Sequence, residues 1–256
     1  MRSKQIKLDS ISNIRDLSSI ANKEGYFIKP KKLIRSERLC NATVEDMNKL
    51  YDEYDLRTIV DFRADIEFEQ IKDTIVKDIK LVHCLLEESV SLGVAQDEET
   101  MRQREEFFKS LEDKCKNQEF AFNHMKGFYR YMGESEYTLS GYSKFVKELV
   151  NNENCILWHC SVGRDRAGCA TAIILEILDV DRDTIIEDYL STNDYIENSE
   201  MLTGAFSVFK YAQKEYIEEY YKTVEEKYGT FENYLKALGV TDEIKQILKN
   251  KYLLID

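Results

Sequence analysis

The sequence predicts an α/β fold with a central, mainly parallel sheet of about four to five strands flanked by helices. Three short apolar runs rich in β-forming residues, at 57–62, 79–86 and 155–160, are separated by sequence of helical character. This alternation is the βαβ pattern of a parallel sheet, whose strands are buried on both faces. With one proline and ten glycines in 256 residues, helices should form most of the remainder.

The elements around these strands follow from local patterns. Residues 25–39 predict a short hairpin that turns near Pro30, and a helix is expected within "NATVEDMNKLYDEY". The charged stretch 87–117 predicts additional lid helices. Residues 166–180 are apolar on nearly every face, which indicates a buried helix directly after the third strand.

Residues 201–256 predict a helical C-terminal extension that packs on the core. Aromatic residues recur there at spacings of three and four, which favours packing over a binding surface, and Gly229 is a good C-terminal cap. Thr241 or Asp242 is expected to be the N-cap of the last helix. We expect one domain over 1–256, with a catalytic core at 1–200, because 43% hydrophobic residues can form one sizeable core.

Charge and composition exclude several classes of function. A net charge of −12 argues against broad binding of nucleic acid or anionic membranes. No apolar run is long enough for a membrane segment or a signal peptide, so we expect a cytoplasmic protein, with signal-independent export left open. The three histidines and six cysteines form no CxxC pair or ligand spacing, so reduced thiols, no metal and no cofactor are expected.

The stretch "HCSVGRDRAG", residues 159–168, carries the clearest chemical signal. We call residues 160–166 the cysteine loop. A loop between a buried strand and a buried helix can turn its backbone N–H groups, from Ser161 to Arg166, toward a tetrahedral dianion, and the helix N-terminus adds its positive dipole. Gly163 permits the tight turn, and the planar guanidinium of Arg166 can hold two phosphate oxygens. The expected phosphate-contacting residues are Ser161, Val162, Gly163, Arg164, Ala167 and Gly168.

The same positive environment favours the thiolate of Cys160, which would attack phosphorus and form a phosphocysteine that water later hydrolyses. His159 either orients the loop by hydrogen bonding or is a satisfied core histidine. Cys84, Cys155 and Cys169 lie in apolar sequence and are interpreted as core residues.

The leaving oxygen of a phosphate ester needs an acid. A Trp-Pro-Asp acid loop is impossible here, because the single tryptophan is Trp158 in the third strand and the single proline is Pro30. Asp165 inside the cysteine loop is the preferred acid. The alternative is that Asp165 only orders the loop, with the acid supplied by the lid residues Asp97, Glu98 or Glu99.

The sequence resembles the bacterial tyrosine phosphatase family. "HCSVGRDRAG" is similar to that family's His-Cys-x-x-Gly-Lys-Asp-Arg-Thr-Gly loop. "NIRDL" (13–17), "LIRSERL" (33–39), "IVDFRADIE" (59–67), "DYLSTNDY" (188–195) and "YGTFENYLKALGV" (228–240) are similar to its other motifs, in the same order.

The resemblance implies a dual-specificity-like cysteine-phosphatase fold, with Cys160 as nucleophile, Arg166 as phosphate clamp, Asp165 in the acid role, and no metal. It implies phosphotyrosine as substrate, in some members also phosphoserine, phosphothreonine or phosphoinositides. Two departures from the motif are Arg164 in place of lysine and Ala167 in place of threonine, which bear on lipid activity and on turnover. Asp61 and Arg63 end a strand on the same side as the loop, where they either support the loop or form only a structural salt bridge, which is the preferred interpretation.

The leading hypothesis is therefore a phosphatase that acts on phosphotyrosine. The alternative is a phosphoinositide or inositol-phosphate phosphatase, in which the basic run "KPKKLIRSER" (29–38) would hold extra phosphates. A hypothesis from outside the phosphatases is a non-catalytic phosphate-binding module or a thiol redox sensor. The partner is thus a phosphorylated protein or a phosphoinositide, and the oligomeric state is left open.

Overall fold

A mixed α/β architecture is present in the computed structural model, which describes residues 2–86, 110, 114, 117–196 and 209–255. The sheet formed by these residues has six strands in the order β1-β2-β3-β6-β4-β5. Their bounds are β1 Lys4–Gln5, β2 Ile14–Asp16, β3 Leu33–Ser36, β4 Leu56–Asp61, β5 Lys80–His83 and β6 Cys155–His159. The predicted fold class is confirmed.

The central strands β3, β6, β4 and β5 are parallel, and β1 and β2 add an antiparallel edge that was not predicted. The three predicted strands form at nearly the expected residues. Strand β6 lies between β3 and β4, and all its residues are buried. The side chains of Cys155 and Leu157 face one core, whereas Ile156 and Trp158 face the other, as alternation along a strand requires.

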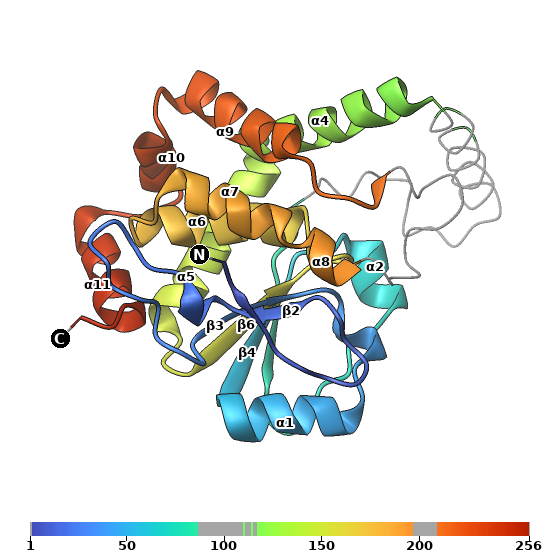
Figure 1. Ribbon diagram of the computed structural model, residues 1–256, viewed down its shortest axis with the longest axis vertical. Coiled ribbons are helices and arrows are strands. Elements are labelled where there is room, and N and C mark those ends of the chain that lie inside the picture. Colours follow the sequence, from blue (N-terminus) through green and yellow to red (C-terminus); the bar gives the residue numbers. More distant parts are fainter. Residues whose placement is uncertain (1, 87–109, 111–113, 115–116, 197–208, 256) are drawn as a thin grey trace.

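Helices cover both faces of the sheet (Figure 1), with α1 (Val44–Tyr54) on one face and α5 (Glu136–Asn151), α6 (Arg166–Ile177) and α7 (Arg182–Leu190) on the other. Helix α6 buries almost every side chain, as predicted. The further helical segments are η1 Leu17–Ser19, η2 Leu39–Asn41, α2 Asp65–Gln70, α4 Gln118–Glu134, α8 Asn193–Ile196, α9 Lys214–Tyr228, α10 Phe231–Ala237 and α11 Asp242–Tyr252.

The C-terminal helices α9, α10 and α11 share the larger core with the sheet. Tyr216, Tyr220 and Tyr221 of α9 are buried in this core, which confirms that the tyrosines serve packing. Helix α9 ends at Gly229 with a φ of 83°, and Thr241 is the N-cap of α11. Within the described residues, no helix is both long enough and apolar enough to cross a bilayer.

The predicted hairpin at 25–39 is wrong. Phe27 pairs with Ala21 and Ile28 pairs with Leu253, whereas β3 pairs with β2 and β6. The chain turns after Pro30 because the Asp16 carboxylate accepts a hydrogen bond from the N–H of Lys31, which has a φ of 60°. The predicted lid lies almost entirely outside the described residues, and so do Asp97, Glu98 and Glu99.

Candidate active site

The cysteine loop begins where strand β6 ends and stops where helix α6 begins. Cys160 follows directly after His159, and Arg166 is the first residue of α6. Because β6 is central and parallel to its neighbours, the loop emerges at the carboxyl end of the sheet, where ligands of α/β folds bind. Cys160 lies at the base of the loop and is 1% exposed, whereas Ser161, Val162 and Arg166 are partly exposed at its rim.

Gly163 is the position in the loop that only glycine fits. Its φ is 73°, in the left-handed region. A Cβ atom at this position would lie 2.4 Å from the carbonyl oxygen of Ser36 at the end of β3. The close approach of the two backbones therefore shapes the loop.

Three consecutive carbonyl groups of the loop are held by donors elsewhere in the chain. The Ser161 carbonyl accepts from the Arg38 N–H at 3.2 Å, the Val162 carbonyl from Asn13 Nδ2 at 2.7 Å, and the Gly163 carbonyl from the Arg35 guanidinium at 2.9 Å. Within the described part of the chain, the N–H groups of residues 161–165 donate to no protein acceptor. The loop thus offers consecutive amide donors, which is the arrangement that binds an oxyanion.

Arg166 is held by a carboxylate that the sequence analysis did not single out. Its guanidinium donates to Glu67 Oε2 at 2.8 Å and to Ser161 Oγ at 3.0 Å, and the Ser161 hydroxyl donates to the other Glu67 oxygen. Burial by itself would raise the pKa of Glu67, but Arg166 and the Ser161 hydrogen bond outweigh it and lower the pKa to about 2. The signal was present, because Glu67 is the last residue of the motif "IVDFRADIE".

Asp165 is bound from two sides. The Tyr129 hydroxyl of α4 donates to Oδ1 at 2.6 Å, and the Arg164 guanidinium donates to both carboxylate oxygens at 2.8 and 3.0 Å. The Tyr129 hydroxyl also lies 2.7 Å from the hydroxyl of Tyr189 on α7. Burial, and then the charge of Asp165, raise the pKa of Tyr129 well above its usual value, so the phenol keeps its proton.

Arg164 faces the protein interior. Its guanidinium is 2% exposed and, besides binding Asp165, donates to the backbone carbonyls of Phe209 and Lys210 just before α9. Its backbone remains part of the loop. The Arg164 guanidinium is thus engaged in the interior, and a phosphate contact of residue 164 through its amide group stays a prediction.

His159 belongs to a buried charged cluster beside the loop. Its Nε2 lies 3.1 Å from Asp73, its Nδ1 lies 3.8 Å from Asp61, and Nδ1 is 3.2 Å from the Cys160 carbonyl. Arg63 pairs with Asp61 at 2.6 Å and with Asp73 at 2.8 Å, which is the expected structural salt bridge. Burial lowers the pKa of His159, but Asp61 and Asp73 outweigh this and raise it.

Asp61, Asp73 and His159 also place three metal-ligand atoms close together. The donor set does not fit a cation, because the guanidinium of Arg63 already binds both carboxylates. Two cations beside the same pair of oxygens would repel each other in a buried site.

Ala167 and Gly168 form the first turn of α6 against buried neighbours. The Ala167 carbonyl lies 3.3 Å from Trp158 Nε1 and accepts the Thr171 hydroxyl at 2.7 Å. A Cβ at Gly168 would lie 3.2 Å from the Tyr189 ring. Ala167 therefore fixes the start of the helix against β6, and Gly168 lets it pack closely against α7.

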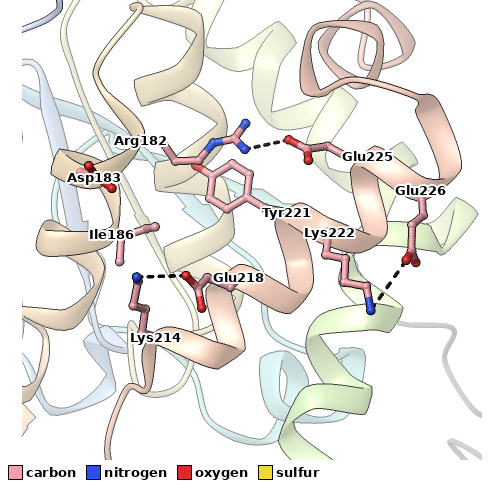
Figure 2. A pocket seen from close by; sticks show the side chains of 9 residues that line it. All are labelled: Arg182, Asp183, Ile186, Lys214, Glu218, Tyr221, Lys222, Glu225 and Glu226. Atoms are coloured by element: carbon pink, nitrogen blue, oxygen red, sulfur yellow. Dashed lines mark hydrogen bonds and ion pairs between the residues drawn. The ribbon is translucent and has the colours of Figure 1, made fainter.

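A cleft of about 590 Å³ lies elsewhere, between α7 and α9. Figure 2 shows its charged side chains in pairs, Arg182 with Glu225, Lys214 with Glu218 and Lys222 with Glu226. No residue of the cysteine loop lines this cleft. It is therefore separate from the candidate active site.

Residues 6–254, nearly the whole chain, match the tyrosine phosphatase family. The chain belongs to the tyrosine phosphatase family. This confirms the resemblance drawn from the cysteine loop and its flanking motifs.

Two relatives of this family member are named phosphatases. The triple specificity protein phosphatase PtpB of Mycobacterium tuberculosis is 32% identical over 108 residues, which cover 34% of this chain and 39% of that protein. A protein of Cupriavidus necator that bears the name of a tyrosine-protein phosphatase is 25% identical over 192 residues, 73% of this chain and 63% of its own length. The chain thus spans less than two thirds of either relative.

Proposed function

We propose that this family member is a cysteine-dependent phosphatase that hydrolyses phosphotyrosine through a phosphocysteine intermediate. The observation that carries the proposal is the orientation of the loop backbone. Three consecutive carbonyl groups are held by Arg38, Asn13 and Arg35, which leaves the amide donors of the loop around the cysteine. This arrangement supports binding of the phosphoryl group next to the nucleophile.

In the first step, the Cys160 thiolate attacks phosphorus, so that an S–P bond forms and the P–O bond to the tyrosyl oxygen breaks. The amide donors and the Arg166 guanidinium stabilise the charge on the equatorial oxygens. The leaving oxygen takes a proton from the acid, a role that we assign to Asp165, with Asp97, Glu98 and Glu99 as the alternatives. In the second step, the carboxylate of the same acid takes a proton from a water molecule as that water attacks phosphorus. The S–P bond breaks, and inorganic phosphate and the Cys160 thiolate are released.

Glu67 supports the proposal by orienting the arginine. Its carboxylate holds one edge of the Arg166 guanidinium, and the Ser161 hydroxyl holds another atom of the same group. A pre-oriented guanidinium loses less entropy when it binds an oxyanion than a mobile one does. Glu67 acts as a positioning residue in this mechanism.

The Cys160→Ser variant tests the mechanism. It should abolish hydrolysis of an aryl phosphate and of a phosphotyrosine peptide, because a serine hydroxyl in the same loop remains protonated. It should still bind inorganic phosphate, measured by calorimetry, since the amide donors and Arg166 are unchanged. Cys169→Ser is the matched control, because that thiol is buried within α6, and its activity should stay within a few-fold of the unmodified protein.

Turnover that survives in Cys160→Ser would refute the nucleophile. If Cys169→Ser also lost hydrolysis of the aryl phosphate and of the phosphotyrosine peptide, the loss of activity in Cys160→Ser would be assigned to impaired folding. Phosphate binding without any hydrolysis by the unmodified protein would favour the non-catalytic phosphate-binding module instead. Because the mycobacterial relative is named for triple specificity, phosphoserine and phosphothreonine peptides belong in the same assay.

A further inference from the structure

Two arginines and one aspartate form a fully buried cluster beside the cysteine loop. Arg15 of β2, Arg35 of β3 and Asp188 of α7 are 0%, 1% and 0% exposed at their side chains. Arg35 lies 3.1 Å from Asp188 Oδ2, and the nearest Arg15–Asp188 carboxylate distance is 4.0 Å. The two guanidinium groups thus share one carboxylate.

The remaining contacts of the cluster are neutral. Arg15 donates to Ser191 Oγ at 2.6 Å and to Thr192 Oγ1 at 2.8 Å, and its guanidinium lies 5.2 Å from the centre of the Tyr195 ring. The second carboxylate oxygen of Asp188 accepts the N–H of Ser3. These contacts satisfy hydrogen-bond donors but do not supply a second negative charge.

Three other arginines beside the loop are matched by carboxylates. Arg164 pairs with Asp165, Arg166 pairs with Glu67, and Arg63 has two carboxylates that it shares with His159. Burial, and then the charge of Arg35, lower the pKa of Arg15 to about 9, so it is still charged near neutral pH. The three residues therefore carry a net charge of +1 in the interior, which the charge of the half-exposed Asp194, itself paired with Arg2, offsets only in part.

An uncompensated buried charge is strongly unfavourable unless an opposite charge lies nearby. The cluster is joined directly to the cysteine loop, because Arg35 donates to the Gly163 carbonyl at 2.9 Å. A Cβ at Gly168 in the first turn of α6 would lie 3.4 Å from the same guanidinium. The loop is thus a place in direct contact with the cluster where a compensating anion can sit.

We propose that the Arg15–Arg35–Asp188 cluster is an electrostatic support of the active site, in which the surplus buried charge of Arg15 stabilises the anions that the cysteine loop holds. Arg35 and Arg15 act through the loop and touch no substrate, so they are positioning residues. The inference rests on the proposed function, since it assumes that the loop binds an oxyanion. At an effective dielectric constant of about 20, one unit charge within roughly 10 Å changes the affinity for an anion about tenfold.

The test compares three substitutions that alter charge and structure separately, with inorganic phosphate as the probe. Arg15→Met removes the surplus charge, and phosphate should inhibit aryl phosphate hydrolysis about tenfold more weakly. Arg15→Lys keeps the charge but loses the hydrogen bonds to Ser191 and Thr192, and it should restore most of the affinity. Asp188→Asn raises the net charge of the cluster to +2. Phosphate should then bind more tightly, although the protein is less stable.

Thermal unfolding of each variant, with and without phosphate, shows that it is folded at the assay temperature. Equal loss of affinity in Arg15→Met and Arg15→Lys would overturn the inference, because it would assign the effect to the lost contacts. Weaker phosphate binding in Asp188→Asn would contradict it independently. If the unmodified protein neither binds phosphate nor hydrolyses the ester, the proposed function fails instead, so the two failures are distinct.

Discussion

Asp165 stands between two arginines in the sequence, and the folded chain uses these arginines differently. Arg164 turns inward and pairs with Asp165, whereas Arg166 pairs with Glu67 at the rim of the loop. Arg164 and Tyr129 hold the Asp165 carboxylate by hydrogen bonds at both oxygens. To reach a leaving oxygen, Asp165 must therefore give up part of these contacts when substrate binds.

Replacement of Asp165 by asparagine separates an acid from an ordering residue. An acid matters most for a poor leaving group, so hydrolysis of phosphotyrosine should fall about 100-fold while an activated nitrophenyl phosphate loses much less. Steady-state kinetics with both esters measures the difference. Tyr129→Phe keeps the carboxylate and should affect both esters alike. If Asp165→Asn lowered the rates of hydrolysis of the two esters equally, another residue would be the general acid.

Glu67 gives a prediction for both activity and pH. Glu67→Gln removes the charge that orients Arg166, and kcat for an aryl phosphate should fall about tenfold. The exposed neighbour Glu69, changed to Gln, is the matched control and should behave as the unmodified protein. An unchanged kcat in Glu67→Gln would show that Glu67 does not position Arg166 for catalysis.

The pH dependence of stability has a definite sign at Glu67. Its pKa is lowered to about 2 in the folded protein, so its ion pair contributes stability above the ordinary value of 4.5. That contribution is lost as the pH falls from about 4.5 toward 2. Unfolding midpoints measured from pH 5 to pH 3 should therefore decline less in Glu67→Gln than in the unmodified protein.

At the scale of the element, the cysteine loop owes its shape to neighbours that are distant in sequence. Asn13, Arg35 and Arg38 hold its carbonyl groups, and Ser36 approaches Gly163 so closely that a side chain has no room. Residues just before β2, in β3 and just before η2 therefore hold the loop in its shape. Its own sequence supplies the glycine that permits the turn.

Gly163→Ala tests this dependence. The left-handed φ costs about 1 kcal/mol or more for a residue with a side chain, and the overlap with Ser36 adds to it. We expect a lower unfolding midpoint and a clear loss of phosphate binding. Gly127→Ala in α4 is the control, since its Cβ meets nothing within 4 Å and alanine favours a helix. Equal effects of the two changes would contradict this account.

At the scale of the whole molecule, the two ends of the parallel sheet have different roles. The cysteine loop lies at the carboxyl end of β6. The basic residues Lys29, Lys31 and Lys32 lie before β3, at the opposite end, and Lys31 and Lys32 donate to the carbonyls of Glu53 and Glu153 that precede β4 and β6. The three lysines of the basic run therefore give no support to extra phosphate contacts at the active site, whereas Arg35 and Arg38 of the same run contact the cysteine loop.

This separation predicts the outcome of a charge change. The triple variant Lys29→Gln, Lys31→Gln, Lys32→Gln should hydrolyse phosphotyrosine peptide and soluble inositol phosphates within about twofold of the unmodified rates, since exposed charges beyond a Debye length of about 8 Å are screened. Steady-state rates on both substrates are the measurement. A tenfold loss confined to inositol phosphates would revive the phosphoinositide alternative.

The sequence by itself determined the βαβ order, the buried helix α6 and the helical C-terminal region, because hydrophobic periodicity is a local property. The family followed from the resemblance of its motifs, which are also local. The sequence also placed Cys160 and Arg166 at the ends of one short loop. It could not assign Arg164 to the interior, recognise Glu67 as the partner of Arg166, or join Arg15, Arg35 and Asp188. Those pairings connect residues up to 173 positions apart, and they exist because the sheet order brings β2, β3 and β6 side by side under α7. Only the tertiary structure decides which buried charge pairs with which partner. The reason is that the free-energy cost of an unpaired buried charge depends on all the groups that surround it in the folded protein.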